Sequence, residues 1–279
     1  MPSRLTEQMG GWADGRIARA PDYPPIRLSA YPTWELLLEP HGRPGAENMA
    51  VDVELLQRAD ATGDAFLRLY RFGPPCLSFG RNESTAGYDR AAIERLGLDV
   101  IRRPTGGGAV WHEHELTYAV AAPISMFGGL RAAYRAIHER VATALRSLGT
   151  DATLAPDRLT ARPPDRRRSC FAAPVGGEVL VAGRKLVGSA QVRRRGAFLQ
   201  HGSILLDGSQ EIVGVISRQS SVISRETNLS RVLGRSVDFQ EVADAIVAAW
   251  DGAVTSTDLP QPPPSSRTCF SSPAWTWRR

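Results

Sequence analysis

Apolar residues recur along the chain with two different periods, and each period predicts a different kind of element. Over 130–148 they return every three or four positions, which predicts an amphipathic helix that ends at Gly149. The same spacing over 46–60 predicts a second helix. Asp238 and Glu241 have the spacing of a capping box, so a third helix is predicted to begin there.

Short runs in which apolar residues alternate with polar ones, or follow one another directly, predict β-strands. These strands are predicted over 34–38, 65–72, 76–80, 98–101, 109–111, 116–121, 178–181, 185–187 and 198–206. Hairpin-like strands with a few helices dispersed among them predict an α+β fold. Every apolar run falls well short of the ~18 residues that span a bilayer, so we expect no membrane segment.

The two ends of the chain differ in composition from its middle. Residues 1–30 contain Gly, Pro and charged residues without a clear period, which predicts a loosely ordered lead-in and no signal peptide. Residues 253–279 include the sequence Pro-Gln-Pro-Pro-Pro-Ser-Ser, which predicts a disordered tail. A single domain is therefore predicted over 31–252, a length that can bury a substantial core.

Arginine gives the chain its positive charge. The formal net charge is +5, and arginines cluster at 102–103, 166–168 and 193–195. Such clusters attract nucleic acid or an acidic protein, although an arginine-rich genome also produces them. The three cysteines are widely spaced and form neither a disulfide framework nor a zinc pattern, which predicts a cytoplasmic protein.

Three stretches place glycine and small polar residues inside strand-like sequence. They are Arg102–His112 (RRPTGGGAVWH), Gly183–Gln191 (GRKLVGSAQ) and Leu199–Leu206 (LQHGSILL). Glycine allows positive φ angles and lets the main chain lie directly against a ligand. One such stretch alone is equally typical of a hairpin turn, but three of them indicate a binding site.

These stretches resemble the signatures of the biotin/lipoate protein ligase catalytic domain. The resemblance rests on Arg102–His112, Lys185–Gln191 and Gln200–Ser203, with Asn48-Met49-Ala50 and Ser169-Cys170-Phe171 in the same order, and covers roughly residues 30 to 250. The family includes lipoate–protein ligases and the octanoyltransferases of lipoate synthesis. It implies a mixed, largely antiparallel sheet backed by helices.

Two residues are the candidates for catalysis. Cys170 matches the position where the ligase-like octanoyltransferases carry an acyl-accepting cysteine, and it follows an arginine run, which lowers the pKa of a thiol. Lys185 matches the lysine of the family pattern and can stabilise a thiolate or an oxyanion. Cys76 is interpreted as a core residue, and Cys269 as an incidental free thiol.

The resemblance also implies a set of substrate-binding residues around the acyl pocket. They are Arg103, Thr105, Gly106, Gly107, Gly108, His112, Gly188, Ser189, Ala190 and His201. Neither histidine receives an acid or base role. His112 and His114 alternate around Glu113, which is a poor metal pattern, and we expect no metal. Glu113 replaces the Asp that is common in the family, and His138 is expected to be solvated.

The leading hypothesis is a protein N-octanoyltransferase without a cofactor. An octanoyl or lipoyl group would pass from an acyl carrier protein thioester to Cys170, and then to a lysine of a lipoyl-domain acceptor. The glycine-cleavage H protein and a dehydrogenase E2 subunit are the candidate acceptors, and another lipoyl domain remains open as the donor. We expect a monomer that binds neither nucleic acid nor membrane.

Two alternatives belong to other classes. An ATP-dependent lipoate–protein or biotin–protein ligase would use ATP and Mg to form an acyl-adenylate. Many such ligases carry an accessory C-terminal domain, whereas only about 30 residues follow the last predicted helix here. A non-catalytic scaffold that keeps the fold is the third hypothesis, and the presence of Cys170 and Lys185 argues against it.

Overall fold

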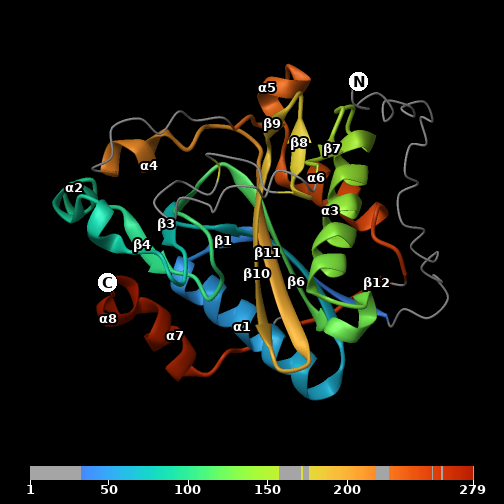
Figure 1. Cartoon of the computed structure of the whole chain (residues 1–279), viewed down its shortest axis with the longest axis horizontal. Helices are drawn as coiled ribbons and strands as arrows, with labels where there is room; N and C mark the ends of the chain where they lie inside the picture. Colours follow the sequence, from blue (N-terminus) through green and yellow to red (C-terminus); the bar gives the residue numbers. More distant parts are fainter. Residues whose placement is uncertain are drawn as a thin grey trace, which may run out of the picture. The chain divides into compact units, whose positions relative to one another are not determined.

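The computed structural model describes residues 33–156, 171, 176–217, 226–252, 254–258 and 260–278, and a six-stranded mixed sheet forms its centre (Figure 1). The strand order is β10-β11-β6-β2-β1-β12. The strands are β1 (Trp34–Arg43), β2 (Ala65–Phe72), β6 (Glu115–Pro123), β10 (Val187–Arg194), β11 (Ala197–Leu205) and β12 (Val254–Ser256). The pairs from β10 to β2 are antiparallel, and β1 runs parallel to β2 and β12. The expected mixed, largely antiparallel sheet is confirmed.

Two small sheets add to this centre. One has the order β4-β3-β5, and the other has the order β7-β8-β9. Their strands are β3 (Cys76–Phe79), β4 (Asp99–Arg102), β5 (Val110–His112), β7 (Thr153–Leu154), β8 (Val179–Val181) and β9 (Arg184–Lys185). The glycine-rich segment 103–109 connects β4 to β5, as the pattern predicted.

Helices cover both faces of the central sheet. The helices are α1 (Gly45–Thr62), α2 (Arg90–Arg95), α3 (Leu130–Ser147), α4 (Glu211–Ile216), α5 (Leu229–Leu233) and α6 (Phe239–Ala248), with 3₁₀ turns η2 (Thr85–Gly87) and η3 (Ile124–Phe127). The three helices predicted from spacing are α1, α3 and α6. The backbone N–H of Glu241 donates to the Asp238 carboxylate at 2.8 Å, so the predicted cap of α6 is present.

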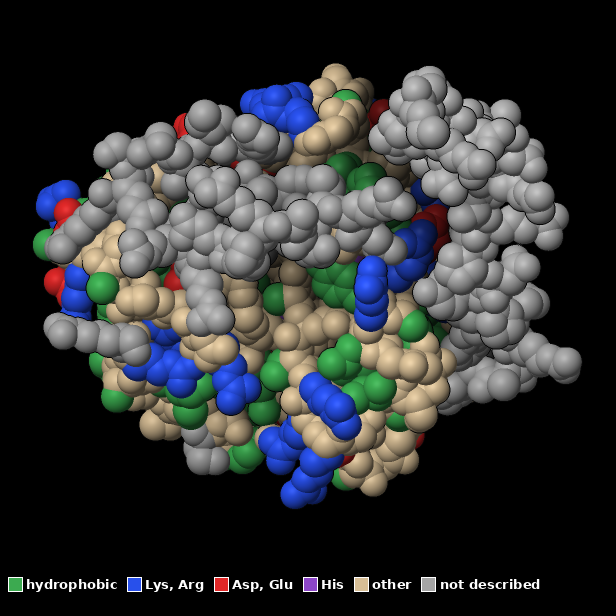
Figure 2. Space-filling model, viewed as in Figure 1, with side chains coloured by type: hydrophobic (Ala, Val, Ile, Leu, Met, Phe, Trp, Pro, Cys, Tyr) green, Lys and Arg blue, Asp and Glu red, His purple; other side chains and the backbone are tan. Residues whose placement is uncertain are grey.

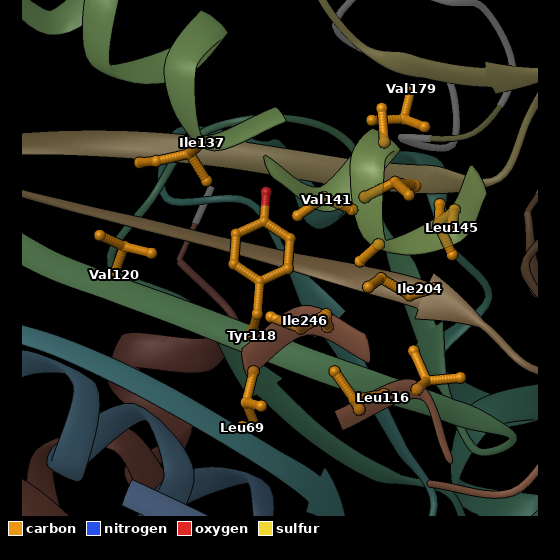
Figure 3. Close-up of a cluster of buried hydrophobic side chains, with 14 of the residues drawn as sticks. Leu69, Leu116, Tyr118, Val120, Ile137, Val141, Leu145, Val179, Ile204 and Ile246 are labelled. Atoms are coloured by element: carbon orange, nitrogen blue, oxygen red, sulfur yellow. The ribbon is translucent and has the colours of Figure 1, made fainter. Parts of the chain in front are cut away.

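Alternation along the strands divides the core into two layers. In β6, Leu116, Tyr118 and Val120 point toward α3 and α6, where they pack among apolar side chains from both helices (Figure 3). Ala119 and Ala121 point to the opposite face and pack with residues of α1. Because neighbouring strand residues face opposite sides, one strand serves both layers. The candidate site lies on the α1 face.

The segment expected to be a disordered tail forms two further helices, so that expectation is wrong for the residues described there. They are α7 (Pro264–Ser271) and α8 (Pro273–Thr276). Each begins with a proline in its first turn, where the missing N–H costs nothing. Phe270 is buried against the α1 layer. The Pro and Ser content that suggested disorder thus initiates helices instead.

Arg102, which precedes the glycine-rich segment, anchors the C-terminal segment that contains α7 and α8. The Arg102 guanidinium donates to the carbonyls of Trp275, Thr276 and Arg278 at 3.1 Å each. The Trp275 indole N–H donates back to the Arg102 carbonyl at 2.7 Å.

The predicted lead-in, residues 1–30, lies outside the described residues. Within the described part of the chain, no helix has the length and apolar character needed to cross a membrane.

Candidate active site

A cavity of about 350 Å³, including its opening to solvent, lies on the α1 face of the sheet. Four of its residues form one row across four strands. Gly188 of β10 pairs with Ser203 of β11, Ser203 with Thr117 of β6, and Thr117 with Tyr70 of β2. Three inter-strand spacings of about 4.8 Å make this row roughly 14 Å long. The row forms the floor of an elongated, mainly apolar slot.

The two ends of the row differ in chemistry. At the β2 end, Tyr70 is joined by Phe72 and by Met49 of α1. At the β10 end, a side chain on Gly188 would come within 2.8 Å of the Phe171 ring, so only glycine leaves room for that ring. The small residues of the row therefore leave space between an aromatic wall and the Phe171 ring.

His112 projects into the cavity with both ring nitrogens engaged. Its Nδ1 lies 2.7 Å from a carboxylate oxygen of Glu115, and its Nε2 lies 2.7 Å from the Ser78 hydroxyl. The imidazole also stacks on the Phe72 ring, with the ring centroids 4.0 Å apart. Stacking and two polar contacts fix the orientation of this ring.

His201 is held in a similar way from the other side. Its Nδ1 lies 2.9 Å from Asp52, and its Nε2 lies 2.6 Å from the Thr105 hydroxyl. Burial lowers the pKa of His201, so the ring is neutral near pH 7 and donates from Nδ1 to Asp52. Thr105 must then donate its proton to Nε2. Thr105 thus reaches the site through His201.

Asp52 depends on further buried partners. Arg68 donates to one of its oxygens at 2.7 Å, and the Tyr70 hydroxyl donates to the other at 3.0 Å. Burial favours the neutral acid, but the hydrogen bond from His201 and the charge of Arg68 together hold the pKa of Asp52 below its usual value. The network continues from Arg68 to the side-chain oxygen of Asn48 at 2.7 Å.

Arg103 fixes the glycine-rich segment. Its guanidinium donates to the carbonyls of Gly106 and Gly108 at 2.8 and 2.7 Å, and to the Ser78 hydroxyl at 3.0 Å. Gly107 has a φ angle of 93°, which favours glycine. Arg103 lines the cavity, but among the described residues none of 106–108 does so. Arg103 and the glycine-rich segment therefore hold each other in place, and Arg103 is the one that reaches the cavity.

Lys185 lies beyond the β10 end of the row. Its ammonium is buried, 2.7 Å from a Glu178 carboxylate oxygen and 5.5 Å from the centre of the Phe171 ring. Glu178 also accepts a long hydrogen bond, 3.4 Å, from the Tyr134 hydroxyl. Cys170 lies outside the described residues. Its neighbour Phe171 is described, and it lies between Lys185 and the floor of the cavity.

The prediction that His138 is solvated is wrong, because its side chain is fully buried. Its Nε2 lies 2.8 Å from the Ser189 hydroxyl, which is also 2.7 Å from the Tyr118 hydroxyl. Burial, reinforced by the charge of Lys185, lowers the pKa of His138 to about 3. Ser189 therefore directs its hydroxyl to the α3 face, away from the row, although the residue borders the cavity.

The structure brings most of the predicted substrate residues together. Arg103, His112, Gly188, Ser189, Ala190 and His201 all line the cavity. Several other lining residues were not predicted from the sequence: Tyr70, Phe72, Ser78, Val110, Thr117, Gly202 and Ser203. Five of these seven are polar or aromatic residues within a strand, which is a weak signal, and the place of all seven in the site depends on strand register. Glu113 accepts from the Trp111 indole at 3.0 Å, which gives this unusual residue a local partner.

The described residues contain no group of three or more His, Cys, Asp and Glu side chains placed to hold a metal ion. The polar groups around the cavity are instead paired with one another. The site offers an apolar slot, two oriented imidazoles and a buried ammonium. Such a site suits an enzyme that holds an acyl chain and stabilises negative charge at one end of it.

Solved structures with this fold include lipoate–protein ligases. A bipartite lipoate protein ligase from Thermoplasma acidophilum matches with a TM-score of 0.66 at 21% identity, over 88% of this chain and 98% of that one. A lipoate-protein ligase A bound with ATP matches with a TM-score of 0.66 at 22% identity, over 87% of this chain and 94% of that one. These matches confirm the α+β, biotin/lipoate ligase-like fold.

Relatives with higher identity define the family. Octanoyltransferase LipM of Symbiobacterium thermophilum is 37% identical over 244 residues, which are 81% of this chain and 88% of the relative. Octanoyltransferase LipM of Kyrpidia tusciae is 41% identical over 232 residues, 78% and 82% of the two chains. The model of the lipoyl protein ligase A/B catalytic domain matches residues 44–251. The chain belongs to this family, and it is an acyltransferase.

Proposed function

We propose that this enzyme transfers an octanoyl group from an acyl carrier protein thioester to a lysine of a lipoyl-domain protein, through a thioester on Cys170 and without a cofactor. The observation that carries the proposal is the position of Lys185 and Phe171 at one end of an apolar slot. Cys170 is bonded to Phe171, and neighbouring Cα atoms are about 3.8 Å apart. The names of the relatives, octanoyltransferases, support the octanoyl group.

The acyl chain would lie crosswise over the sheet, along the row from Gly188 to Tyr70. Its carbonyl would lie at the Gly188 end, close to Lys185 and to Phe171, the neighbour of Cys170. Its last carbons would meet Met49, Tyr70 and Phe72. The small floor residues leave room for the chain, and the aromatic end limits its length. This placement explains why one end of the slot is apolar and the other is charged.

The first step forms an acyl-enzyme. The Cys170 thiolate attacks the carbonyl carbon of the donor thioester, and the bond to the donor sulfur breaks as the donor thiolate leaves and takes a proton from water. The Lys185 ammonium would stabilise both the attacking thiolate and the oxyanion of the tetrahedral intermediate. Glu178 fixes the position of that ammonium at 2.7 Å.

The second step transfers the group to the acceptor. The neutral amine of the acceptor lysine attacks the Cys170 thioester, the carbon–sulfur bond breaks, and an amide forms as the amine gives up its proton to solvent. Cys170 leaves as a thiolate, which the Lys185 ammonium again stabilises. A thioester suits this role, because an amine attacks it readily.

The test is a reconstitution without ATP. Purified enzyme is mixed with octanoyl-acyl carrier protein, first without acceptor and then with either the glycine-cleavage H protein or an E2 lipoyl domain. Mass spectrometry should find one octanoyl group on the peptide that contains Cys170, released by hydroxylamine, and then on the acceptor lysine. Cys170→Ser should abolish transfer, because a hydroxyl ionises far less readily than a thiol.

Two matched controls use the remaining cysteines. Cys76 is buried with a pKa well above its usual value, because burial disfavours its thiolate, and Cys269 is exposed. Cys76→Ser and Cys269→Ser should therefore retain transfer. Acceptor modification that requires free octanoate and ATP would contradict the proposal and favour a ligase. Acceptor binding without turnover with any donor would favour a scaffold.

A further inference from the structure

Three consecutive arginines lie at the turn that joins β10 to β11. Arg193, Arg194 and Arg195 are all exposed, and the side chains of Arg194 and Arg195 are 47% and 83% exposed. The Asp60 carboxylate, 4.0 Å from Arg194 and 3.9 Å from Arg195, offsets part of this charge. Lys and Arg side chains gather over this turn, at the lower edge of the view in Figure 2. The turn therefore presents a cationic surface.

The turn is held rigidly. The Gly196 N–H donates to Asp60 at 3.1 Å, and the Gly196 carbonyl accepts from the Ile124 N–H at 2.8 Å. Arg193 donates to the Arg195 carbonyl at 3.0 Å. Arg195 itself has a φ of 47°, a left-handed conformation that would suit glycine or asparagine better. The long, exposed ion pair of Arg195 with Asp60 contributes little in water, so a cationic residue at this left-handed position points to a role for its charge beyond the turn.

The same strand connects this turn to the candidate active site. Gly188 of β10 lines the cavity at its proposed reacting end, and Arg195 follows seven residues later. At about 3.3 Å per strand residue, the turn lies roughly 23 Å from Gly188. A partner docked at the turn must therefore carry the reacting group on a long, flexible arm.

We propose that the β10–β11 turn docks an acidic carrier protein whose acyl thioester reaches the cavity on a pantetheine arm. This inference rests on the proposed function. A lipoyl-domain acceptor presents its amine on a lysine side chain, which is too short for this separation, so the acceptor must dock closer to the cavity. Opposite charges across such a surface mainly accelerate association, and salt screens them over roughly 8–10 Å.

The experiment compares two donors that carry the same acyl group. Arg193→Glu with Arg195→Glu is tested with octanoyl-acyl carrier protein and with octanoyl-pantetheine, and Cys170 acylation is followed by mass spectrometry. With the carrier protein, kcat/KM should fall tenfold or more at low salt, and the loss should shrink as NaCl is added. With octanoyl-pantetheine, kcat/KM should stay unchanged, because this donor needs no docking surface.

A second measurement does not depend on acyl transfer. The affinity for purified holo-acyl carrier protein, measured by fluorescence anisotropy, should fall by the same factor. Arg95→Glu with Arg231→Glu reverses two exposed charges on α2 and α5 and should leave both readouts unchanged.

The outcomes separate this proposal from the proposed function. Unchanged carrier affinity and kcat/KM in the turn variant would overturn the docking surface, as would an equal loss with both donors or a rise in KM for the acceptor alone. Wild-type enzyme that binds the carrier through the turn, but is acylated by neither donor, would support the docking surface and contradict the transfer mechanism.

Discussion

Glu178 is the residue that positions the proposed catalytic lysine. Its carboxylate and the Lys185 ammonium are both buried and 2.7 Å apart, in a part of the site that also contains the neutral His138. Removing one partner of a buried ion pair leaves the other without compensation, which is costly. The position of the ammonium should therefore depend on this carboxylate.

Glu178→Gln keeps the shape of the side chain and removes its charge. We expect single-turnover acylation of Cys170 by octanoyl-pantetheine to slow about tenfold, which corresponds to about 1.4 kcal/mol. The pH profile of Cys170 alkylation by iodoacetamide should also shift upward, a readout that a purely structural role would not change. Glu113→Gln, at an exposed carboxylate, is the control and should keep the wild-type rate. Equal rates in both variants would contradict the positioning role.

At the scale of elements, the floor row joins four strands into one binding surface. Its members come from β10, β11, β6 and β2, and only the register of the strands brings them into line. Met49 of α1 contributes to the lining and belongs to the same buried cluster as Tyr70 and Phe72. A helix residue thus helps to limit the length of the slot.

Met49→Ala should lengthen the slot at that end. We expect the ratio of kcat/KM values for decanoyl and octanoyl thioesters to shift about tenfold toward decanoyl, because one methylene group in an apolar pocket is worth about 1–3 kcal/mol. Met126→Ala makes the same substitution at a partly buried position on the other core layer and should keep the octanoyl preference. An unchanged chain-length profile in Met49→Ala would show that the chain lies elsewhere.

The pattern of apolar and polar residues predicted the helices and strands better than it predicted the site. The strand over 65–72 has the bounds predicted for it, although it is buried on both faces. The helix from Leu130 has the predicted start, because burial on one side of a helix leaves a clear period. The pairing of His201 with Asp52 crosses 149 residues and leaves no local signal. His138 has charged neighbours in the sequence, which suggested a solvated ring. In the structure the ring lies toward Tyr118 and Ser189 of the sheet.

At the scale of the whole molecule, buried neutral histidine couples stability to pH. The pKa of His138 is lowered to about 3, whereas an unfolded chain binds this proton near pH 6.5. Below pH 6.5 the unfolded state therefore holds more protons, and stability falls as the pH falls toward 3. His201 also has a lowered pKa, so it acts in the same direction.

The free energy of unfolding, measured with urea, should drop by about 2 kcal/mol between pH 7.5 and pH 5.0 through His138 alone. His138→Gln removes the titrating group and keeps an amide near Ser189. The drop in its unfolding free energy between pH 7.5 and pH 5.0 should therefore be about 2 kcal/mol smaller than that of the wild type. His114→Gln, at an exposed ring, should keep the wild-type dependence. Parallel pH curves for wild type and His138→Gln would contradict the assignment.

The bonds between Arg102 and the C-terminal helices have a consequence for synthesis on the ribosome. The Arg102 guanidinium finds acceptors in Trp275 and Arg278, 173 and 176 residues further along the chain. At about 5–20 residues per second, these acceptors are made on the order of ten to thirty seconds after Arg102. The nascent chain can form its sheet during that interval, but Arg102 acquires these partners only afterwards. The C-terminal helices are therefore anchored to Arg102 only after residues 275–278 have left the exit tunnel.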